Sequence, residues 1–123
     1  MGKRSVEEII NLAKRIAVEK FVPRASEIDQ NQTFPWENIR ILGETGLLGL
    51  IISEKEGGFG ANRLQFASVA KEIAKACVST GLVYVSHLIV AKAIEYGGSE
   101  MAKKTFFSDM LKGRGLAASA VVI

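Results

Sequence analysis

The stretch Asn62–Cys77, NRLQFASVAKEIAKAC, carries the clearest helical pattern in the chain. Apolar side chains recur along it at i, i+3, i+4, i+7, i+8 and i+11, the spacing of one face of an α-helix. They are Phe66, Val69, Ala70, Ile73, Ala74 and Cys77. Asn is also a residue type that caps helix N-termini. We therefore expect an amphipathic helix that begins after Asn62 and buries this stripe in a core.

Two further helices are predicted downstream of this stretch. Ser79 or Thr80 can cap a helix that runs to about Tyr96, before a Gly-Gly pair. This helix is apolar nearly all round, which favours a central, buried position. Ser99 can cap the last helix, which Gly113 ends. We expect its inner face to hold Phe106, Phe107, Met110 and Leu111, and its outer face to hold Lys103, Lys104 and Asp109.

Two helices are predicted upstream. Ser5, with a Glu three residues later, forms a capping box in front of the first helix. Pro23 should end or kink this helix because proline lacks the backbone N–H. Pro35 fits the first turn of a second helix, which runs to about Glu44 and stops at Gly46.

The C-terminal stretch, residues 116–123, has the small and β-branched character of a strand. The predicted fold class is therefore an all-α bundle of about five helices with a short extended C-terminal segment.

The composition describes one soluble globular domain: 123 residues, 48% hydrophobic and 24% charged. A net charge of +3, spread without interleaved aromatic residues, does not favour nucleic acid. The single cysteine, Cys77, excludes an internal disulfide and fits a reducing, cytoplasmic location. The apolar run Leu82–Ile94 is interrupted by polar residues and is too short to cross a bilayer, so we expect no membrane span.

Three single features call for interpretation: a glycine cluster, the histidine and the cysteine. The glycine cluster Gly57–Gly60 lacks the Lys-Ser/Thr of a phosphate loop, so a structural turn is favoured. His87, the sole histidine, is either a core residue or a site residue. Cys77 lies on the core stripe and is expected to act as a small apolar residue. Neither a metal-ligand cluster nor a catalytic triad has its spacing here.

Four segments, read in order, resemble one family, the acyl-CoA dehydrogenases. Phe34–Gly49 is similar to that family's FPxExxxxLgelGLLG stretch, and Ser53–Asn62 to its PEEYGGxGxD loop. Lys71–Gly81 resembles EEIArxcaStg, and Tyr96–Leu111 resembles fGseeqkqkyLp. The loop departs from the pattern, since Ser53 replaces a Pro and Glu56 an aromatic residue. No single segment is specific, but all four occur in the family's order, and the match covers about residues 8–112.

The resemblance implies a flavoprotein that uses FAD to oxidise acyl-CoA thioesters to the α,β-enoyl form. In the family, a glutamate of the C-terminal domain removes the α-proton and the flavin accepts the β-hydride, which requires both to be positioned together. The N-terminal helical domain forms one wall of the acyl pocket, mainly through its fourth helix. Carried onto this sequence, the wall positions are Val83, Tyr84 and His87.

The resemblance also divides the chain. Residues 1–114 correspond to the helical domain, and residues 115–123 to a truncated start of the middle β domain. Ser119, Ala120 and Val121 correspond to a strand that approaches the flavin. Val122 and Ile123 then stand where the family has Thr-Glu. FAD is thus expected in the full-length family, while the isolated chain is expected to bind none and to be inactive.

The family further implies an acyl-CoA substrate, electron-transfer flavoprotein as a partner, and a homo-oligomer. Two alternatives stay open: a flavin-dependent monooxygenase of the same superfamily, and a non-catalytic helical interaction module. A domain that lacks its neighbours should expose a large apolar surface, whereas a module should be polar except for one groove.

Overall fold

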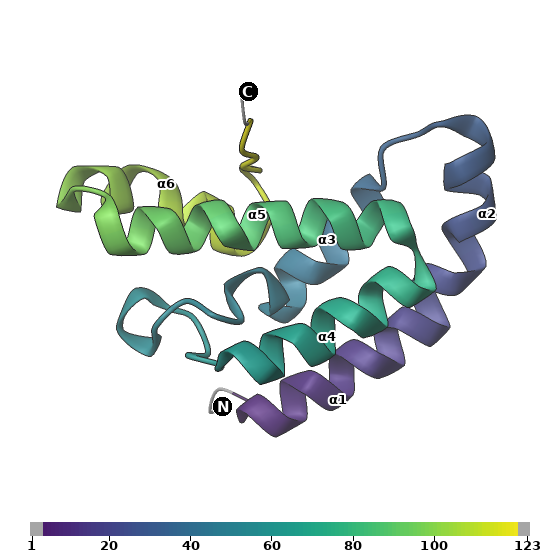
Figure 1. Ribbon diagram of the computed structural model, residues 1–123, viewed down its shortest axis with the longest axis horizontal. Helices are drawn as coiled ribbons and strands as arrows, with labels where there is room; N and C mark the ends of the chain where they lie inside the picture. The colour runs from purple at the N-terminus through teal and green to yellow at the C-terminus, as the bar shows by residue number, and fades with distance from the viewer. Residues whose placement is uncertain (1–3, 121–123) are drawn as a thin grey trace.

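The computed structural model describes residues 4–120, and the fold is an all-helical bundle (Figure 1). Its elements follow one another in this order: α1 (Val6–Ile16), η1 (Ala17–Phe21), α2 (Val22–Asn31), α3 (Trp36–Thr45), η2 (Leu47–Gly49), η3 (Glu54–Glu56), α4 (Arg63–Ala76), α5 (Val78–Gly97) and α6 (Glu100–Lys112). Since α1, η1 and α2 form one continuous helix, the prediction of about five helices is confirmed.

The first long helix changes its winding in the middle. Ser5 and Glu8 make the predicted capping box at its start. Five residues, Ala17–Phe21, are wound as a π-helix directly before Pro23. Proline removes one backbone donor, and π turns are a common place for such a break. The winding of the helix therefore changes near Pro23, but the helix does not end there: α2 continues to Asn31.

The connection from α3 to α4 is compact because glycines let segments of its backbone approach one another closely. Gly46 ends α3 in the left-handed region with φ 88°. Backbone hydrogen bonds then join the end of η2 and the residues after it to the glycine loop, among them Phe59 N–H to the Gly49 carbonyl at 3.1 Å. A Cβ on Gly58 would lie 2.1 Å from the Ile52 carbonyl oxygen. The loop is thus a structural turn, as predicted.

The corner between α4 and α5 differs from the prediction. Asn62 caps α4, with Gln65 completing a capping box. However, α5 begins at Val78, and its N-cap is Cys77, which has an extended backbone and no side-chain cap. The prediction that Ser79 or Thr80 caps this helix was therefore wrong. Thr80 instead lies within the first turn of α5, where it is fully buried.

Close packing at this corner holds the two helices together. A Cβ on Gly81 would lie 2.6 Å from the Ala74 backbone, so α4 and α5 touch main chain to main chain. Beyond this contact, α5 runs over the other helices and α6 returns antiparallel beside it (Figure 1).

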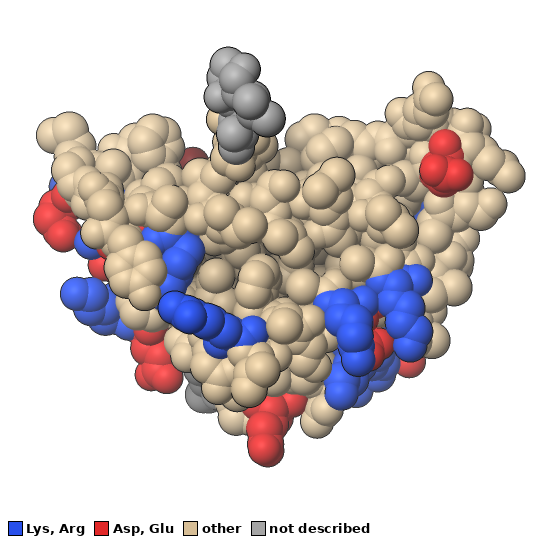
Figure 2. Space-filling view, viewed as in Figure 1, with Lys and Arg blue, Asp and Glu red and all other residues tan. Residues whose placement is uncertain are grey.

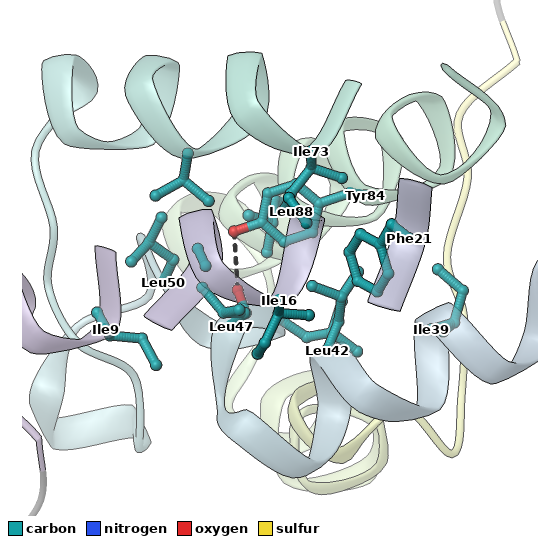
Figure 3. Close-up of a cluster of buried hydrophobic side chains, with 14 of the residues drawn as sticks. Ile9, Ile16, Phe21, Ile39, Leu42, Leu47, Leu50, Ile73, Tyr84 and Leu88 are labelled. Carbon is teal, nitrogen blue, oxygen red and sulfur yellow. Dashed lines mark hydrogen bonds between the residues drawn. The ribbon is translucent and has the colours of Figure 1, made fainter. Parts of the chain in front are cut away.

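The main core lies between α1, α3, α4 and α5 (Figure 3). Side chains from all of these helices meet there with essentially no solvent exposure. They include Ile9, Phe21, Ile39, Leu42, Ile73, Tyr84 and Leu88. Val69 and Ile73 of the α4 stripe are fully buried, which confirms the pattern that predicted this helix.

Helix α5 is long enough and apolar enough to cross a membrane, the only such helix within residues 4–120. It is 20 residues long, longer than the run Leu82–Ile94 suggested. It packs against α2, α3, α4 and α6. The predicted central, buried position holds for one side of α5, whereas its other side lies at the surface.

Helix α6 and the following segment also differ in detail. Ser99 caps α6 and Gly113 ends it with φ 76°, as predicted. Phe107 and Met110 are buried, but Phe106 is 53% exposed, so its place on the inner face was wrong. Residues 116–120 form no strand. A strand needs a partner for its backbone groups, and none of the described elements supplies one.

Candidate functional site: the two faces of α5

Helix α5 carries the predicted wall positions, and it has two distinct faces. The inward face holds its fully or almost fully buried residues: Thr80, Gly81, Tyr84, His87, Leu88 and Ala91. The outward face holds large apolar side chains that solvent reaches. This division decides which predicted residues can meet a ligand directly.

The outward face is an exposed apolar stripe along the helix. Val78, Leu82, Ile89 and Tyr96 are 77%, 68%, 52% and 82% exposed. They follow one another at spacings of four, seven and seven residues, which keeps them on one side of the helix. Figure 2 shows the surface over α5 as largely uncharged, with basic side chains lower on this face. We call these four residues the outer stripe.

A groove lies beside the outer stripe at the N-terminal half of α5. It has a volume of about 480 Å³ and separates α5 from the end of α2 and the loop that follows. Val83 is half-buried on its α5 side, next to Leu82. Phe34 and Pro35 form the opposite side. Of the three predicted wall residues, Val83 is the one that the structure places at an open groove.

Tyr84 lies on the inward face. Its side chain is fully buried, and its hydroxyl donates a hydrogen bond to the Leu47 carbonyl at 2.9 Å (Figure 3). Its ring lies 6.2 Å from that of Phe66. Burial raises the pKa of the Tyr84 hydroxyl far above its ordinary range, so the group stays neutral. Within this domain Tyr84 therefore joins α5 to the core.

His87 also faces inward and is fully buried. Its Nε2 lies 2.9 Å from the Met110 carbonyl at the end of α6. Its Nδ1 accepts a hydrogen bond from the Ala117 N–H at 3.1 Å. Burial lowers the pKa of the His87 imidazole, and the bond to Met110 offsets only part of this effect.

A buried polar chain near the start of α5 was not foreseen from the sequence. Arg24 donates to the Asn38 side-chain oxygen at 3.0 Å, and the Asn38 amide donates to the Thr80 hydroxyl at 2.9 Å. That hydroxyl lies 3.1 Å from the sulfur of Cys77. Asn38 and Thr80 are fully buried. The chain links α2, α3 and α5, so it fixes the entry of α5 into the bundle.

An ion pair fixes the other end of α5. Lys92 Nζ lies 2.6 Å from Glu95 and donates to the Ile51 carbonyl at 2.9 Å. Glu95 also accepts from the Ser53 N–H at 2.8 Å. Burial raises the pKa of Glu95, but the hydrogen bonds from Lys92 and Ser53 outweigh this and lower it overall. The sequence could have predicted this ion pair, because a Lys and a Glu three residues apart interrupt an otherwise apolar helix.

The residues predicted to approach a flavin lie at the C-terminal end of the described segment. Ser119 and Ala120 are both exposed, and Val121 lies outside the described residues. The two described residues thus stand at an open edge of this domain. Residues 4–120 also contain no group of three or more His, Cys, Asp or Glu side chains that could hold a metal ion.

The comparison with known families assigns this helical fold to one class of enzyme domain. The family model described as "Acyl-CoA dehydrogenase, N-terminal domain" matches residues 4–114, so the chain belongs to this family. The family is FAD-dependent. The resemblance seen in the four sequence segments is confirmed.

Three relatives illustrate the match. The probable acyl-CoA dehydrogenase YngJ of Bacillus subtilis is 32% identical over 108 residues, which cover 87% of this chain and 28% of that protein. The short-chain specific acyl-CoA dehydrogenase of Clostridium acetobutylicum is 29% identical over 116 residues, covering 94% of this chain and 31% of that protein. The structure of butyryl-CoA dehydrogenase from Megasphaera elsdenii matches with a TM-score of 0.79 at 23% identity, over 94% of this chain and 32% of that one. The chain thus spans less than a third of each of these relatives.

Proposed function

We propose that this chain acts as the N-terminal domain of a flavin-dependent enzyme that oxidises acyl-CoA thioesters to α,β-enoyl-CoA. In this role the outward side of α5, with the adjoining groove, closes one side of the acyl pocket. The proposal includes an acyl-CoA substrate, electron-transfer flavoprotein as the electron acceptor, and assembly into a homo-oligomer.

The observation that carries the proposal is the exposure of the outer stripe. Large apolar side chains are unfavourable in water, and a run of them along one helix marks a surface that another apolar surface covers. Here the stripe lies on the helix that forms the pocket wall in the family. The stripe continues past the groove to Tyr96, so the exposed apolar surface is larger than a single groove. This favours a domain that packs on neighbours over a polar module with one binding groove.

The three predicted wall residues take different parts in this proposal. Val83 lies at the groove and would contact the acyl chain. Tyr84 and His87 are fully buried behind it, so they would hold α5 in place and act on the pocket only through the helix position. The wall would therefore be completed by Leu82, which lines the same groove.

The chain's own residues supply the wall and the exclusion of water, not the acid–base or redox chemistry. FAD, when bound in the complete enzyme, supplies the acceptor for the β-hydride. Ser119 and Ala120 are exposed at one edge of this domain, so by themselves they do not fit an enclosed flavin.

A domain exchange tests the proposal. Residues 4–114 would replace the matching domain of the short-chain specific enzyme of Clostridium acetobutylicum. We expect this chimera to bind FAD and to oxidise acyl-CoA. Val83→Trp in the chimera should then lower kcat/KM for the longest accepted acyl chains by about 10- to 200-fold relative to shorter ones, because an overlap near the size limit costs about 1–3 kcal/mol.

The matched control is Val18→Trp. Val18 is 66% exposed on η1, outside the groove, so this variant adds the same bulk without touching the proposed wall. Its chain-length profile should equal that of the unmodified chimera. A folded, FAD-loaded chimera without acyl-CoA oxidation would refute the proposed function. An active chimera in which both Trp variants keep the same profile would refute the placement of the wall.

A further inference from the structure

We infer that His87 is a positioning residue that fixes the path of the segment after α6 through a single tautomer of its ring. The ring lies between two backbone groups from different parts of the chain. One is the Met110 carbonyl in the last turn of α6, and the other is the Ala117 N–H beyond it. The imidazole thus connects α5 to both ends of the short turn that leaves the bundle.

The two contacts determine which nitrogen carries the proton. A backbone N–H can only donate, so Nδ1, which faces Ala117 at 3.1 Å, must be unprotonated. In the neutral ring the proton then resides on Nε2, which donates to the Met110 carbonyl at 2.9 Å. The opposite tautomer would place two donors at Ala117 and two acceptors at Met110. Since the ring is fully buried, water cannot rescue either mismatch.

Between these two contacts, the other backbone hydrogen bonds of the turn, from the Gly113, Arg114 and Gly115 N–H groups, all return to α6 itself, and Leu116 packs against the main core. Gly113 adopts φ 76° and ends α6. The Arg114 N–H donates to the Asp109 carbonyl at 2.9 Å, and the Arg114 side chain bonds the Asp109 carboxylate at 3.0 Å. Both bonds return to the exposed side of α6. Ala117 is the first residue after them whose backbone is tied to another helix, and the tie is His87.

Packing supports the same path. Ala117 lies against a small buried cluster that includes Ala91, Phe107 and Met110. Apolar contact alone permits sliding, whereas a hydrogen bond to one ring nitrogen selects one register. Ser119 and Ala120 lie two and three residues further on. If the proposed function is right, His87 therefore also sets where these residues enter the middle domain; the local inference does not depend on that role.

The test uses the 123-residue chain and NMR. Nitrogen-15 shifts of the single imidazole report its tautomer directly, and amide exchange reports the Ala117 bond. We expect the Nε2–H tautomer, and Ala117 exchange at least about tenfold slower than in an unstructured peptide, the effect of one retained hydrogen bond. An Nδ1–H tautomer, or Ala117 exchange as fast as in a peptide, would overturn the inference without any variant.

Two pairs of variants separate positioning from packing. Ala117→Pro removes the donor, whereas Ala118→Pro makes the same change one residue later at an exposed position. Only Ala117→Pro should release the turn and speed tryptic cleavage after Arg114 by about tenfold or more. His87→Asn keeps an acceptor near Nδ1 and should retain slow Ala117 exchange, while His87→Gln keeps only the bond to Met110 and should lose it. Equal cleavage in both proline variants, or equal Ala117 exchange in both His87 variants, would show that packing alone holds the segment.

Discussion

Removal of the Tyr84 side chain should destabilise the domain far more than any change on the outer stripe. The ring is fully buried among core residues from several helices, and its hydroxyl reaches the Leu47 carbonyl. Truncation of a buried aromatic residue to alanine costs about 3–5 kcal/mol, because burial is lost and a cavity is left. For a domain of this size, whose unfolding entropy is about 2 cal/mol/K per residue, each kcal/mol lowers Tm by about 4 °C. Tyr84→Ala should therefore lower Tm by about 12–20 °C.

Tyr84→Phe isolates the hydrogen bond from the packing. It keeps the ring and removes only the hydroxyl. The Leu47 carbonyl retains a second donor, the Leu50 N–H at 3.2 Å, so it is not left without a partner. The cost should therefore be that of one ordinary hydrogen bond, about 0.5–1.5 kcal/mol.

The assay is urea unfolding followed by circular dichroism, with the other tyrosine as the matched control. Tyr96 is 82% exposed and has one ring contact, with the Lys92 ammonium at 5.0 Å. Tyr96→Ala should cost no more than about 1 kcal/mol. If Tyr84→Ala costs as little as Tyr96→Ala, then Tyr84 is not a core anchor. Its predicted place on a ligand-facing wall would then be favoured, and our division of α5 into two faces would be wrong.

Two other perturbations, glycine substitution and a change of pH, probe the helix contacts and two ionisable groups. Gly81→Ala should destabilise the domain by about 1–3 kcal/mol in urea unfolding, since the new Cβ would lie 2.6 Å from the Ala74 backbone. Its control is Gly97→Ala, whose new Cβ has no atom within 4 Å and which should stabilise the domain by about 0.5–1 kcal/mol. A Gly81→Ala protein as stable as the wild type would contradict the close helix crossing. Because the pKa of His87 is lowered in the folded state, the unfolded chain binds the proton first, so stability should be constant above the ordinary value of 6.5 and fall as pH drops below it. The lowered pKa of Glu95 adds a second loss below its ordinary value of 4.5. The urea midpoint, measured from pH 8 down to pH 4, should therefore decline twice as the pH falls. His87→Asn should abolish only the decline that begins at the higher pH.

Helix ends were predictable because the groups that form them are neighbours in the sequence. Ser5, Asn62 and Ser99 accept backbone N–H groups within three residues, and glycines at the ends of α3 and α6 adopt the left-handed backbone that stops a helix. These signals act whatever the rest of the fold does. The start of α5 failed as a prediction because its N-cap residue, Cys77, makes no side-chain capping bond that a residue type could signal. The side chain of Thr80, a favourable cap by type, is occupied by Asn38 from 42 positions earlier.

The orientation of α5 could not be obtained from its sequence for a related reason. Helical spacing places residues 80, 83, 84, 87 and 91 on one face; four of them are buried, and Val83, at the edge of this face, is half-buried. Spacing does not say which face points inward when both faces are apolar, because the pattern then has no contrast. What orients α5 is polar and specific: Asn38 at Thr80, the Leu47 carbonyl at Tyr84, and the two backbone groups at His87. In this domain the polar atoms of a mostly apolar helix thus decide its rotation, and that rotation leaves the outer stripe exposed.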